Sequence, residues 1–336
     1  MKDYYRLRVK EIIKETEDAI TINFKQPFLG RIRYKCGQFI TLVLDINGKE
    51  YRRAYSLNST PGIDDDISIT IKKVSGGIIS NYLFNEVKRG DTILVMRPMG
   101  NFTIESDKKK SRSIVLFGAG SGITPLMSIL KSTLYFEPES TVTLLYSNKT
   151  ESSIIFKDQL DIFKERFADK LFIKHLISQN NNKLDVNKIA EYFNVNPFFR
   201  KEDAGIYMCG PDSYMNSIKE SLLQQGYSEN QIYYESFTPK KETVAEDFQV
   251  VFKSGKKEST VVVKAGKSLL DAGLDAGVRM RFACFNGQCG TCKCKCITGK
   301  VKMAVDHILS PEEITDGYVL TCVGYPDSEG VVLELD

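Results

Sequence analysis

Five of the eight cysteines lie between Cys284 and Cys296, and a sixth follows at Cys322. Cys284, Cys289 and Cys292 are separated by four and then two residues, and Cys322 follows after another 29. Four thiolates, two on each iron, neutralise charge and complete both tetrahedra of a [2Fe–2S] cluster. The spacing therefore predicts that these four cysteines hold such a cluster.

A structural zinc site is the alternative use of clustered cysteines. Zinc sites usually combine two pairs of the C-x2-C type, whereas only one such pair occurs among the predicted ligands. Gly287 and Gly290 lie inside the loop, where we expect any side chain to crowd the cluster. Cys294 and Cys296 alternate as in a strand, so we expect small core residues there rather than ligands.

Two short motifs in the first hundred residues offer groups that suit a flavin nucleotide. Arg53 presents a guanidinium fork for a pyrophosphate, Tyr55 a ring that stacks on a flavin, and Ser56 a hydroxyl for its polar edge. Gly77 exposes backbone N–H groups, and Ser80 is expected to start a helix whose N-terminus faces phosphate. Either motif alone also fits an ordinary strand and turn, so the flavin interpretation depends on the pairing.

A glycine-rich turn joins an apolar run to a helical segment in the middle of the chain. Gly118, Gly120 and Gly122 let a dinucleotide pyrophosphate approach the backbone, and Thr124 is the expected helix cap. The G-x-G-x-x-G pattern is absent, so the context of strand, turn and helix carries the indication. Cys209 ends a later strand, where open α/β sheets bind ligands; a buried small residue is the alternative interpretation.

Three patterns follow one another along the chain and predict the elements that position these groups. Residues 1–108 contain β-branched runs such as Ile67–Lys72 broken by turn dipeptides, which predicts an antiparallel barrel or sandwich. Residues 109–237 alternate strands with helices, which predicts a parallel sheet with helices on both faces. The polar stretch 238–246 is a predicted linker, and residues 247–336 form a third module.

The alternating region gives the sharpest element predictions. A stripe of apolar residues from Phe156 to Phe167 has the spacing of an amphipathic helix. The expected strands are Ile114–Phe117, Thr141–Tyr146, Leu171–Ile177, Gly205–Cys209 and Ile232–Ser236.

Composition excludes several classes of partner. The 336 residues carry a formal net charge of +3, which indicates neither nucleic acid nor an anionic membrane as partner. Residues 246–336 hold 11 basic and 13 acidic residues, a net charge of −2. The charged N-terminus lacks a signal-peptide core, and the apolar window Ile114–Leu130 contains three glycines and a proline. We therefore expect a cytoplasmic protein without membrane insertion.

Together, the motifs resemble those of the ferredoxin–NADP reductase superfamily, and the last module resembles plant-type ferredoxins. Essentially the whole chain is similar to reductase components of multicomponent oxygenases, the reductase subunits of phenylacetyl-CoA epoxidases among them. The resemblance implies a flavin-binding β-barrel, an α/β nucleotide domain and an α+β, β-grasp-like ferredoxin domain.

The resemblance also implies roles for individual residues. FAD is expected on Arg53, Ala54, Tyr55, Ser56, Gly77 and Ser80. The nicotinamide nucleotide is expected on Gly118, Gly120, Gly122, Thr124, Cys209 and Gly210. Glu235 and Phe237 match a family position near the flavin, and Ser56, Cys209 and Glu235 are the expected catalytic residues.

The preferred nucleotide depends on the segment after the second strand of the alternating region. Ser147 and Lys149 lie there, with Ser153 and Lys157 following, and these cations and hydroxyls suit the 2′-phosphate of NADPH. Glu151 is the alternative, since an acid on the ribose 2′-OH favours NADH.

The expected function is electron transfer from NADPH, through FAD and the [2Fe–2S] cluster, to a partner oxygenase. That partner is expected to be a phenylacetyl-CoA epoxidase-like or related di-iron or ring-hydroxylating system. Two alternatives stay open: an NADH-dependent reductase for a desaturase or ring hydroxylase, and a non-enzymatic iron–sulfur or zinc carrier or sensor.

Overall fold

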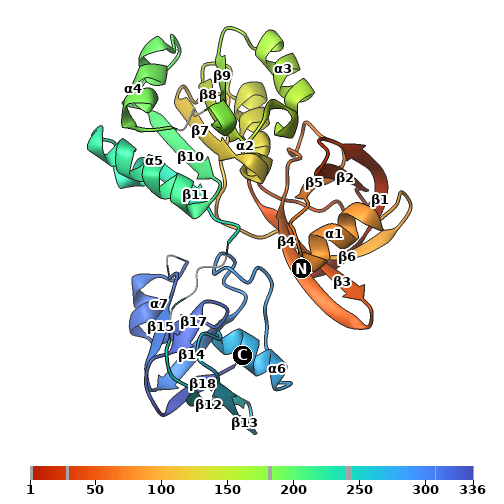
Figure 1. Cartoon of the computed structure of the whole chain (residues 1–336), viewed down its shortest axis with the longest axis vertical. Helices are drawn as coiled ribbons and strands as arrows, with labels where there is room; N and C mark the ends of the chain where they lie inside the picture. Colours follow the sequence, from red (N-terminus) through yellow and green to blue (C-terminus); the bar gives the residue numbers. More distant parts are fainter. Residues whose placement is uncertain are drawn as a thin grey trace. The chain divides into compact units, whose positions relative to one another are not determined.

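The computed structural model describes residues 3–27, 30–180, 184–238, 242, 244–306 and 308–335. The chain divides into two compact units, Met1–Ser236 and Phe237–Asp336 (Figure 1). Among the described residues, no helix has both the length and the apolar character needed to cross a membrane.

The first sheet of the first unit is a six-stranded antiparallel barrel. Its strand order is β4-β3-β6-β1-β2-β5, and a bridge between Leu57 and Ile69 brings the two outer strands together. The strands are β1 (Tyr4–Lys14), β2 (Ala19–Lys25), β3 (Phe39–Ile46), β4 (Lys49–Ser56), β5 (Ile67–Lys72) and β6 (Thr92–Met96), with α1 (Ile78–Asn85) after β5. Buried isoleucine, leucine and valine side chains fill the interior, so the predicted barrel is confirmed.

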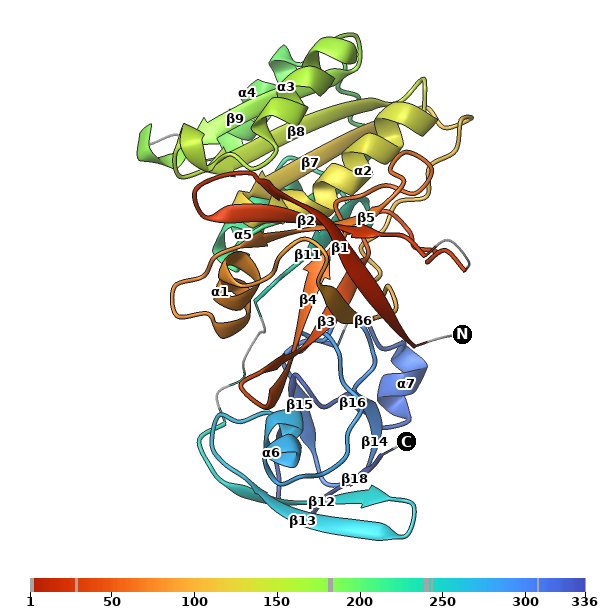
Figure 2. The ribbon, with the colours of Figure 1, turned by 90° about the vertical axis from the view of Figure 1, so that its right-hand side faces the viewer.

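The second sheet of the same unit is fully parallel, in the order β11-β10-β7-β8-β9. Its strands are β7 (Ser113–Ala119), β8 (Thr141–Asn148), β9 (Leu171–Ile177), β10 (Ala204–Cys209) and β11 (Ile232–Glu235). The helices are α2 (Ile123–Phe136), α3 (Lys157–Arg166), α4 (Val186–Val195) and α5 (Asp212–Gln224). α4 and α5 share a core with one face of the sheet, and α2 packs on the other face (Figure 2). This confirms the predicted α/β architecture.

Two predicted helix boundaries are wrong by one or two residues. Phe156 and Phe167 flank α3 as its caps rather than lying inside it, and Phe156 adopts a left-handed backbone with φ of 62°. α2 begins at Ile123 with Gly122 as its N-cap, so Thr124 lies inside the first turn. Its hydroxyl donates to the Ser121 carbonyl at 3.0 Å, which a threonine on the first turn does readily.

Buried polar contacts join the barrel to α2 of the parallel sheet. The Ser128 hydroxyl donates to the Ser59 carbonyl at 2.7 Å, and the Thr60 hydroxyl donates to the Ser128 carbonyl at 3.2 Å. Lys131, almost fully buried, pairs with Asp64 at 2.5 Å. Because groups buried in this way are costly to leave unpaired, these contacts fix the barrel against the sheet.

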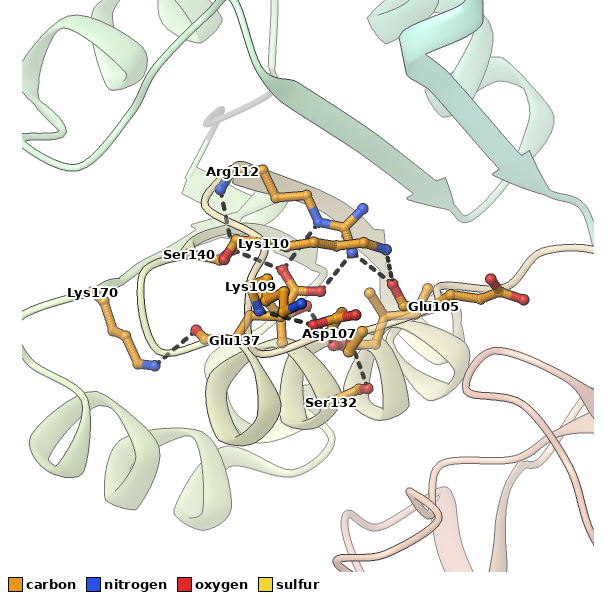
Figure 3. A network of polar contacts seen from close by, with 12 residues as sticks. Glu105, Asp107, Lys109, Lys110, Arg112, Ser132, Glu137, Ser140 and Lys170 are labelled. Carbon is orange, nitrogen blue, oxygen red and sulfur yellow. Dashed lines mark hydrogen bonds and ion pairs between the residues drawn. The ribbon is translucent and has the colours of Figure 1, made fainter.

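A second polar network lies at the far end of α2 (Figure 3). The Glu137 carboxylate accepts hydrogen bonds from Arg112 Nε at 3.0 Å, Arg112 Nη2 at 2.6 Å and Ser140 Oγ at 2.7 Å. Lys170 Nζ donates to the Glu137 carbonyl at 3.3 Å, and Arg112 Nη2 also reaches the Glu105 carbonyl at 3.1 Å. The network holds the start of β7 against the end of α2.

The second unit is an α+β module. Its main sheet has the order β13-β12-β18-β14-β16, and β15 pairs with β17 in a small second sheet. The strands are β12 (Phe248–Ser254), β13 (Lys257–Val263), β14 (Lys293–Thr298), β15 (Val301–Met303), β16 (Tyr318–Leu320), β17 (Gly324–Pro326) and β18 (Val331–Glu334), and the helices are α6 (Leu269–Asp275) and α7 (Pro311–Thr315). Of the predicted linker 238–246, residues 239–241 and 243 lie outside the described residues.

Candidate active site and cluster-binding loop

Three residues predicted to be catalytic come together where the barrel meets the parallel sheet. Ser56 ends β4, and its hydroxyl donates to Glu235 Oε2 at 3.0 Å. Glu235 ends β11 and is paired in register with Cys209, the last residue of β10. All three side chains are buried. The fold thus places a hydroxyl, a carboxylate and a thiol at the carboxyl ends of neighbouring strands.

The Cys209 thiol is held in its neutral form. Complete burial, and after it the nearby Glu235 carboxylate, raises the pKa of Cys209 well above 9.0. Cys209 therefore does not supply a thiolate nucleophile. The geometry suits a small, polarisable donor that packs against a flat ligand.

The remaining residues of the predicted flavin motif lie on β4. Arg53 is exposed and Tyr55 is half-buried, and strand alternation puts both on one face of β4. Burial raises the pKa of Tyr55, while Arg53 opposes that rise. Ala54 shares the opposite face with Ser56. The strand therefore presents a cation and a ring on one face and the Ser56 hydroxyl at the other.

Gly77 and Ser80 shape the start of α1 differently from the prediction. Gly77 is the N-cap, and Ser80 lies in the first turn instead of starting the helix. The Ser80 hydroxyl accepts from the Val74 N–H at 3.1 Å, and a Cβ on Gly77 would lie 2.7 Å from that hydroxyl. Ser80 therefore braces the turn, while the N-terminus of α1 carries no side-chain cap. An uncapped helix start suits an anion such as phosphate.

The glycine-rich turn packs directly on the end of β10. Gly120 has φ of 53°, a conformation that favours glycine. A Cβ on Gly122 would overlap the Cys209 carbonyl and lie 2.9 Å from the Gly210 nitrogen. A Cβ on Gly210 would in turn lie 2.9 Å from the Ala119 side chain. Backbone therefore meets backbone here, which brings the predicted nucleotide residues beside Cys209.

Two tyrosine hydroxyls hold the carbonyl groups of this turn. Tyr146 donates to the Gly120 carbonyl at 2.9 Å, and Tyr214 donates to the Gly118 carbonyl at 3.1 Å. The Ser147 hydroxyl donates to the Tyr214 oxygen at 3.5 Å. Sequence reasoning missed both tyrosines, because a tyrosine within a strand or a helix indicates only core packing.

Of the two lysines proposed to bind the 2′-phosphate of NADPH, one is without an ion pair to another described residue. The Ser153 hydroxyl is occupied by a capping box, in which it donates to the Thr150 carbonyl at 2.7 Å and accepts from the Thr150 N–H at 3.1 Å. Lys157 pairs with Asp161 at 2.9 Å. Lys149 is exposed and has no ion-pair partner within the described part of the chain. Phe237 belongs to the second unit, so its place near the flavin stays a prediction.

The four predicted ligand cysteines converge in the second unit. The Cys284 thiol contacts the thiols of Cys289 and Cys322, and the Cys292 thiol contacts that of Cys322. The thiols therefore form two pairs, Cys284 with Cys289 and Cys292 with Cys322, and the contact between Cys284 and Cys322 joins the two pairs. Two pairs of sulfurs side by side are what two tetrahedral irons require, so the residues fit a [2Fe–2S] cluster.

Backbone N–H groups point at these sulfurs. Gln288 N donates to Cys284 Sγ at 3.4 Å, and Thr291 N donates to Cys289 Sγ at 3.4 Å. Hydrogen bonds from the Cys289 and Cys322 thiols, together with backbone N–H groups, lower the pKa of Cys284 well below the usual value of a thiol. N–H donors of this kind stabilise ligand thiolates and tune the potential of a cluster.

The loop reaches this arrangement through left-handed backbone at three residues. Phe285, Gly287 and Gly290 have φ of 61°, 72° and 69°. A Cβ on Gly287 would lie 3.0 Å from the Val323 side chain. Among protein atoms, a side chain at position 287 would therefore clash with Val323. Cys294 is buried in the core of the unit, as predicted, whereas Cys296 is only partly buried.

Three family models match consecutive parts of the chain. The oxidoreductase FAD-binding domain matches residues 6–104, and the oxidoreductase NAD-binding domain matches residues 116–220. The 2Fe-2S iron-sulfur cluster binding domain matches residues 251–327. The cofactor set expected from the sequence, FAD, NAD(P)H and [2Fe–2S], is confirmed by these matches.

Similar proteins cover the whole chain. A subunit of 1,2-phenylacetyl-CoA epoxidase from Escherichia coli is 33% identical over 355 aligned residues, covering 100% of this chain and 99% of its own. The ferredoxin reductase component of 3-ketosteroid-9-alpha-monooxygenase from Mycobacterium tuberculosis is 31% identical, covering 98% and 95%. The solved structure of phthalate dioxygenase reductase shares the fold, with a TM-score of 0.69, 23% identity and coverage of 99% and 98%.

Proposed function

The chain belongs to the FAD- and [2Fe–2S]-containing reductase components of oxygenase systems, and we propose that it passes electrons from NADPH to an oxygenase component. When bound, FAD would supply an acceptor for the two electrons of a hydride, and the cluster would supply a carrier that passes electrons on one at a time. The convergence of Ser56, Cys209 and Glu235 at the ends of three strands supports this proposal, because it brings a hydroxyl, a carboxylate and a thiol together between the barrel and the parallel sheet.

Ser56, Cys209 and Glu235 are the proposed catalytic residues. The Ser56 hydroxyl, oriented by Glu235 at 3.0 Å, is placed to hydrogen-bond the polar edge of the flavin. The neutral Cys209 thiol is placed to pack on the nicotinamide. Because all three groups are buried, ligands that enter here leave water behind, which strengthens the polar contacts.

Binding of the two nucleotides is assigned to the surrounding turns. For FAD we propose Arg53 on the pyrophosphate, Tyr55 on the ring, and the uncapped start of α1 at Gly77 on phosphate. Ser80 supports that site through its hydroxyl, which holds the turn before α1, and Ala54 lies between Arg53 and Tyr55 on β4. For NADPH we propose the N–H groups of the turn and of α2, from Gly118, Gly120, Gly122 and Thr124 with Gly210 alongside.

The preference for NADPH over NADH is a proposal supported by Lys149 and Ser147. Lys149 is an exposed cation next to the end of β8, and Ser147 lies two residues before it. A 2′-phosphate placed there gains a charge-assisted contact, which a ribose hydroxyl does not offer. Glu151 is exposed in the same segment and is the residue that would favour NADH.

Anaerobic stopped-flow reduction tests the proposal. The holoprotein should contain one FAD and two irons per chain, and NADPH should reduce the flavin and then the cluster. Cys209→Ala should slow flavin reduction at least about tenfold, or ~1.4 kcal/mol of barrier, and leave cluster reduction from flavin intact. Cys36→Ala, which removes another buried cysteine of the first unit, is the matched control.

Metal content and donor choice complete the test. Cys322→Ser should lose the cluster, whereas Cys294→Ala should keep two irons per chain. A zinc-containing colourless protein, or flavin reduction equally fast in Cys209→Ala, contradicts the proposal. Faster reduction by NADH than by NADPH contradicts the donor assignment alone.

An oxygenase is the proposed electron acceptor because the two relatives named above are components of a 1,2-phenylacetyl-CoA epoxidase and of a 3-ketosteroid-9-alpha-monooxygenase. We also propose a cytoplasmic location, since a reducing compartment keeps ligand thiols from forming disulfides. Turnover of a candidate oxygenase with this protein and NADPH, against no turnover without it, tests the partner.

A further inference from the structure

Positive charge in the second unit is concentrated around the cluster-binding loop. Residues 246–336 have a net charge of −2, yet the stretch 276–305 contains six basic residues and no acidic one. These six residues are Arg279, Arg281, Lys293, Lys295, Lys300 and Lys302. The same stretch holds three of the four predicted ligand cysteines, so the positive charge belongs to the segment that carries the cluster-binding loop.

Several of these cations are engaged inside the unit. Lys293 pairs with Glu313, and Lys302 pairs with Glu242 at 2.8 Å. Lys295 lies over the Tyr318 ring, 5.7 Å from its centroid. Such contacts use the lysines to stabilise the module itself.

Arg279 and Arg281 are different. Both are exposed, and neither has an ion-pair partner among the described residues of the chain. Between them, Met280 is half-buried and packs against Gly273 of α6, whereas the arginine side chains on either side of it are exposed to solvent. They lie five and three residues before Cys284, at the entrance to the cluster loop.

We propose that Arg279 and Arg281 form a docking surface for an acidic face of the protein that accepts electrons from the cluster. This inference rests on the proposed function, since it needs an electron acceptor that approaches the loop. Cys289 and Gly290 are only partly buried, so the loop that follows these arginines in the sequence reaches the surface. Two unpaired guanidinium groups there attract carboxylates and orient an acidic partner toward the nearest ligand sulfur.

Reoxidation of the reduced cluster by charged probes tests the inference. The holoprotein, reduced with dithionite so that the NADPH step is bypassed, is mixed with ferricyanide or with hexaammineruthenium(III). In Arg279→Glu/Arg281→Glu at low ionic strength, oxidation by ferricyanide should slow about tenfold and oxidation by the cationic probe should accelerate. In 1 M salt, where the Debye length is about 3 Å, the variant should match wild type within about twofold.

Lys256→Glu/Lys257→Glu is the matched control, because it makes the same charge change at two exposed lysines, one in the turn after β12 and one at the start of β13. Equal effects in both double variants mean that net charge acts alone, and this outcome overturns the inference. Unchanged probe rates with a slower flavin-to-cluster step also overturn it, since the arginines then serve internal transfer. If NADPH fails to reduce the wild-type cluster, the proposed function fails while the probe ratio still reports on the arginines.

Discussion

The ion pair between Arg112 and Glu137 gives a prediction whose size follows from its geometry. The Glu137 side chain is 0% exposed, and three hydrogen bonds reach its carboxylate, two of them from Arg112. Arg112→Gln therefore leaves a buried carboxylate with Ser140 as its remaining side-chain donor. Removal of one partner of a buried pair costs about 3–5 kcal/mol.

The lower end of that range applies here. Arg112 is 23% exposed, so water can approach the vacated position and offset part of the loss. We expect Arg112→Gln to lower the unfolding free energy by about 3 kcal/mol, which for a unit of this size lowers Tm by roughly 6–12 °C. Thermal unfolding followed by flavin fluorescence measures this, because flavin release reports on the first unit.

A double-mutant cycle separates the pair from its surroundings. Arg112→Gln/Glu137→Gln should be more stable than Arg112→Gln alone, because no buried charge remains. Arg200→Gln, which breaks an exposed pair with Asp203, should cost about 0.5 kcal/mol or less. The reasoning is refuted if Arg112→Gln costs no more than Arg200→Gln, or if the double variant loses the sum of the two single losses.

Three further predictions concern the first unit. Gly122→Ala should abolish NADPH binding, measured by equilibrium titration, because the added Cβ overlaps the Cys209 carbonyl. Tyr214→Phe should raise KM for NADPH about fivefold, or ~1 kcal/mol, with kcat unchanged, because the Gly118 carbonyl loses its hydrogen bond. The control Tyr227→Phe should leave KM unchanged. Burial raises the pKa of Glu15 above 4.5, so the folded state holds the proton more tightly than the unfolded state. The unfolding free energy therefore falls as pH rises through the folded pKa. Glu15→Gln should flatten this dependence of the unfolding free energy on pH, measured by urea unfolding.

Each of these has an outcome that contradicts it. Wild-type NADPH affinity in Gly122→Ala would mean that the turn moves freely away from β10. A fall in kcat with constant KM in Tyr214→Phe would place the hydroxyl in chemistry rather than in support. An identical pH slope in Glu15→Gln and wild type would assign the slope to other carboxyl groups.

The fold was predictable where a local pattern determines the structure. The apolar run Ile114–Phe117 is a strand because the parallel sheet buries both of its faces. The edge strand β9 has the predicted bounds, Leu171–Ile177. The cysteine ligands were predictable because three of them lie on one short loop. The four-residue and two-residue gaps encode the loop without reference to the rest of the chain.

Contacts between distant segments were not predictable in this way. Ser128 and Lys131 look like polar positions of a surface helix, yet both are buried against the barrel. Ser153 and Ser80 were assigned to ligands, but their hydroxyls close local turns, as serine side chains commonly do. The support of Gly118 by Tyr214 joins residues 96 positions apart, and no local pattern encodes that register.

The hydrogen bond between Ser56 and Glu235 joins residues 179 positions apart, and Glu235 lies at the very end of the first unit. During synthesis, the barrel strands leave the ribosome long before β11 is made, and domains tend to fold in that order. A nascent chain can therefore assemble a flavin-binding barrel while the carboxylate that orients Ser56 is still missing. Completion of β11 is therefore a late assembly step, and a product of synthesis truncated before it lacks the Glu235 carboxylate that accepts the hydrogen bond from Ser56.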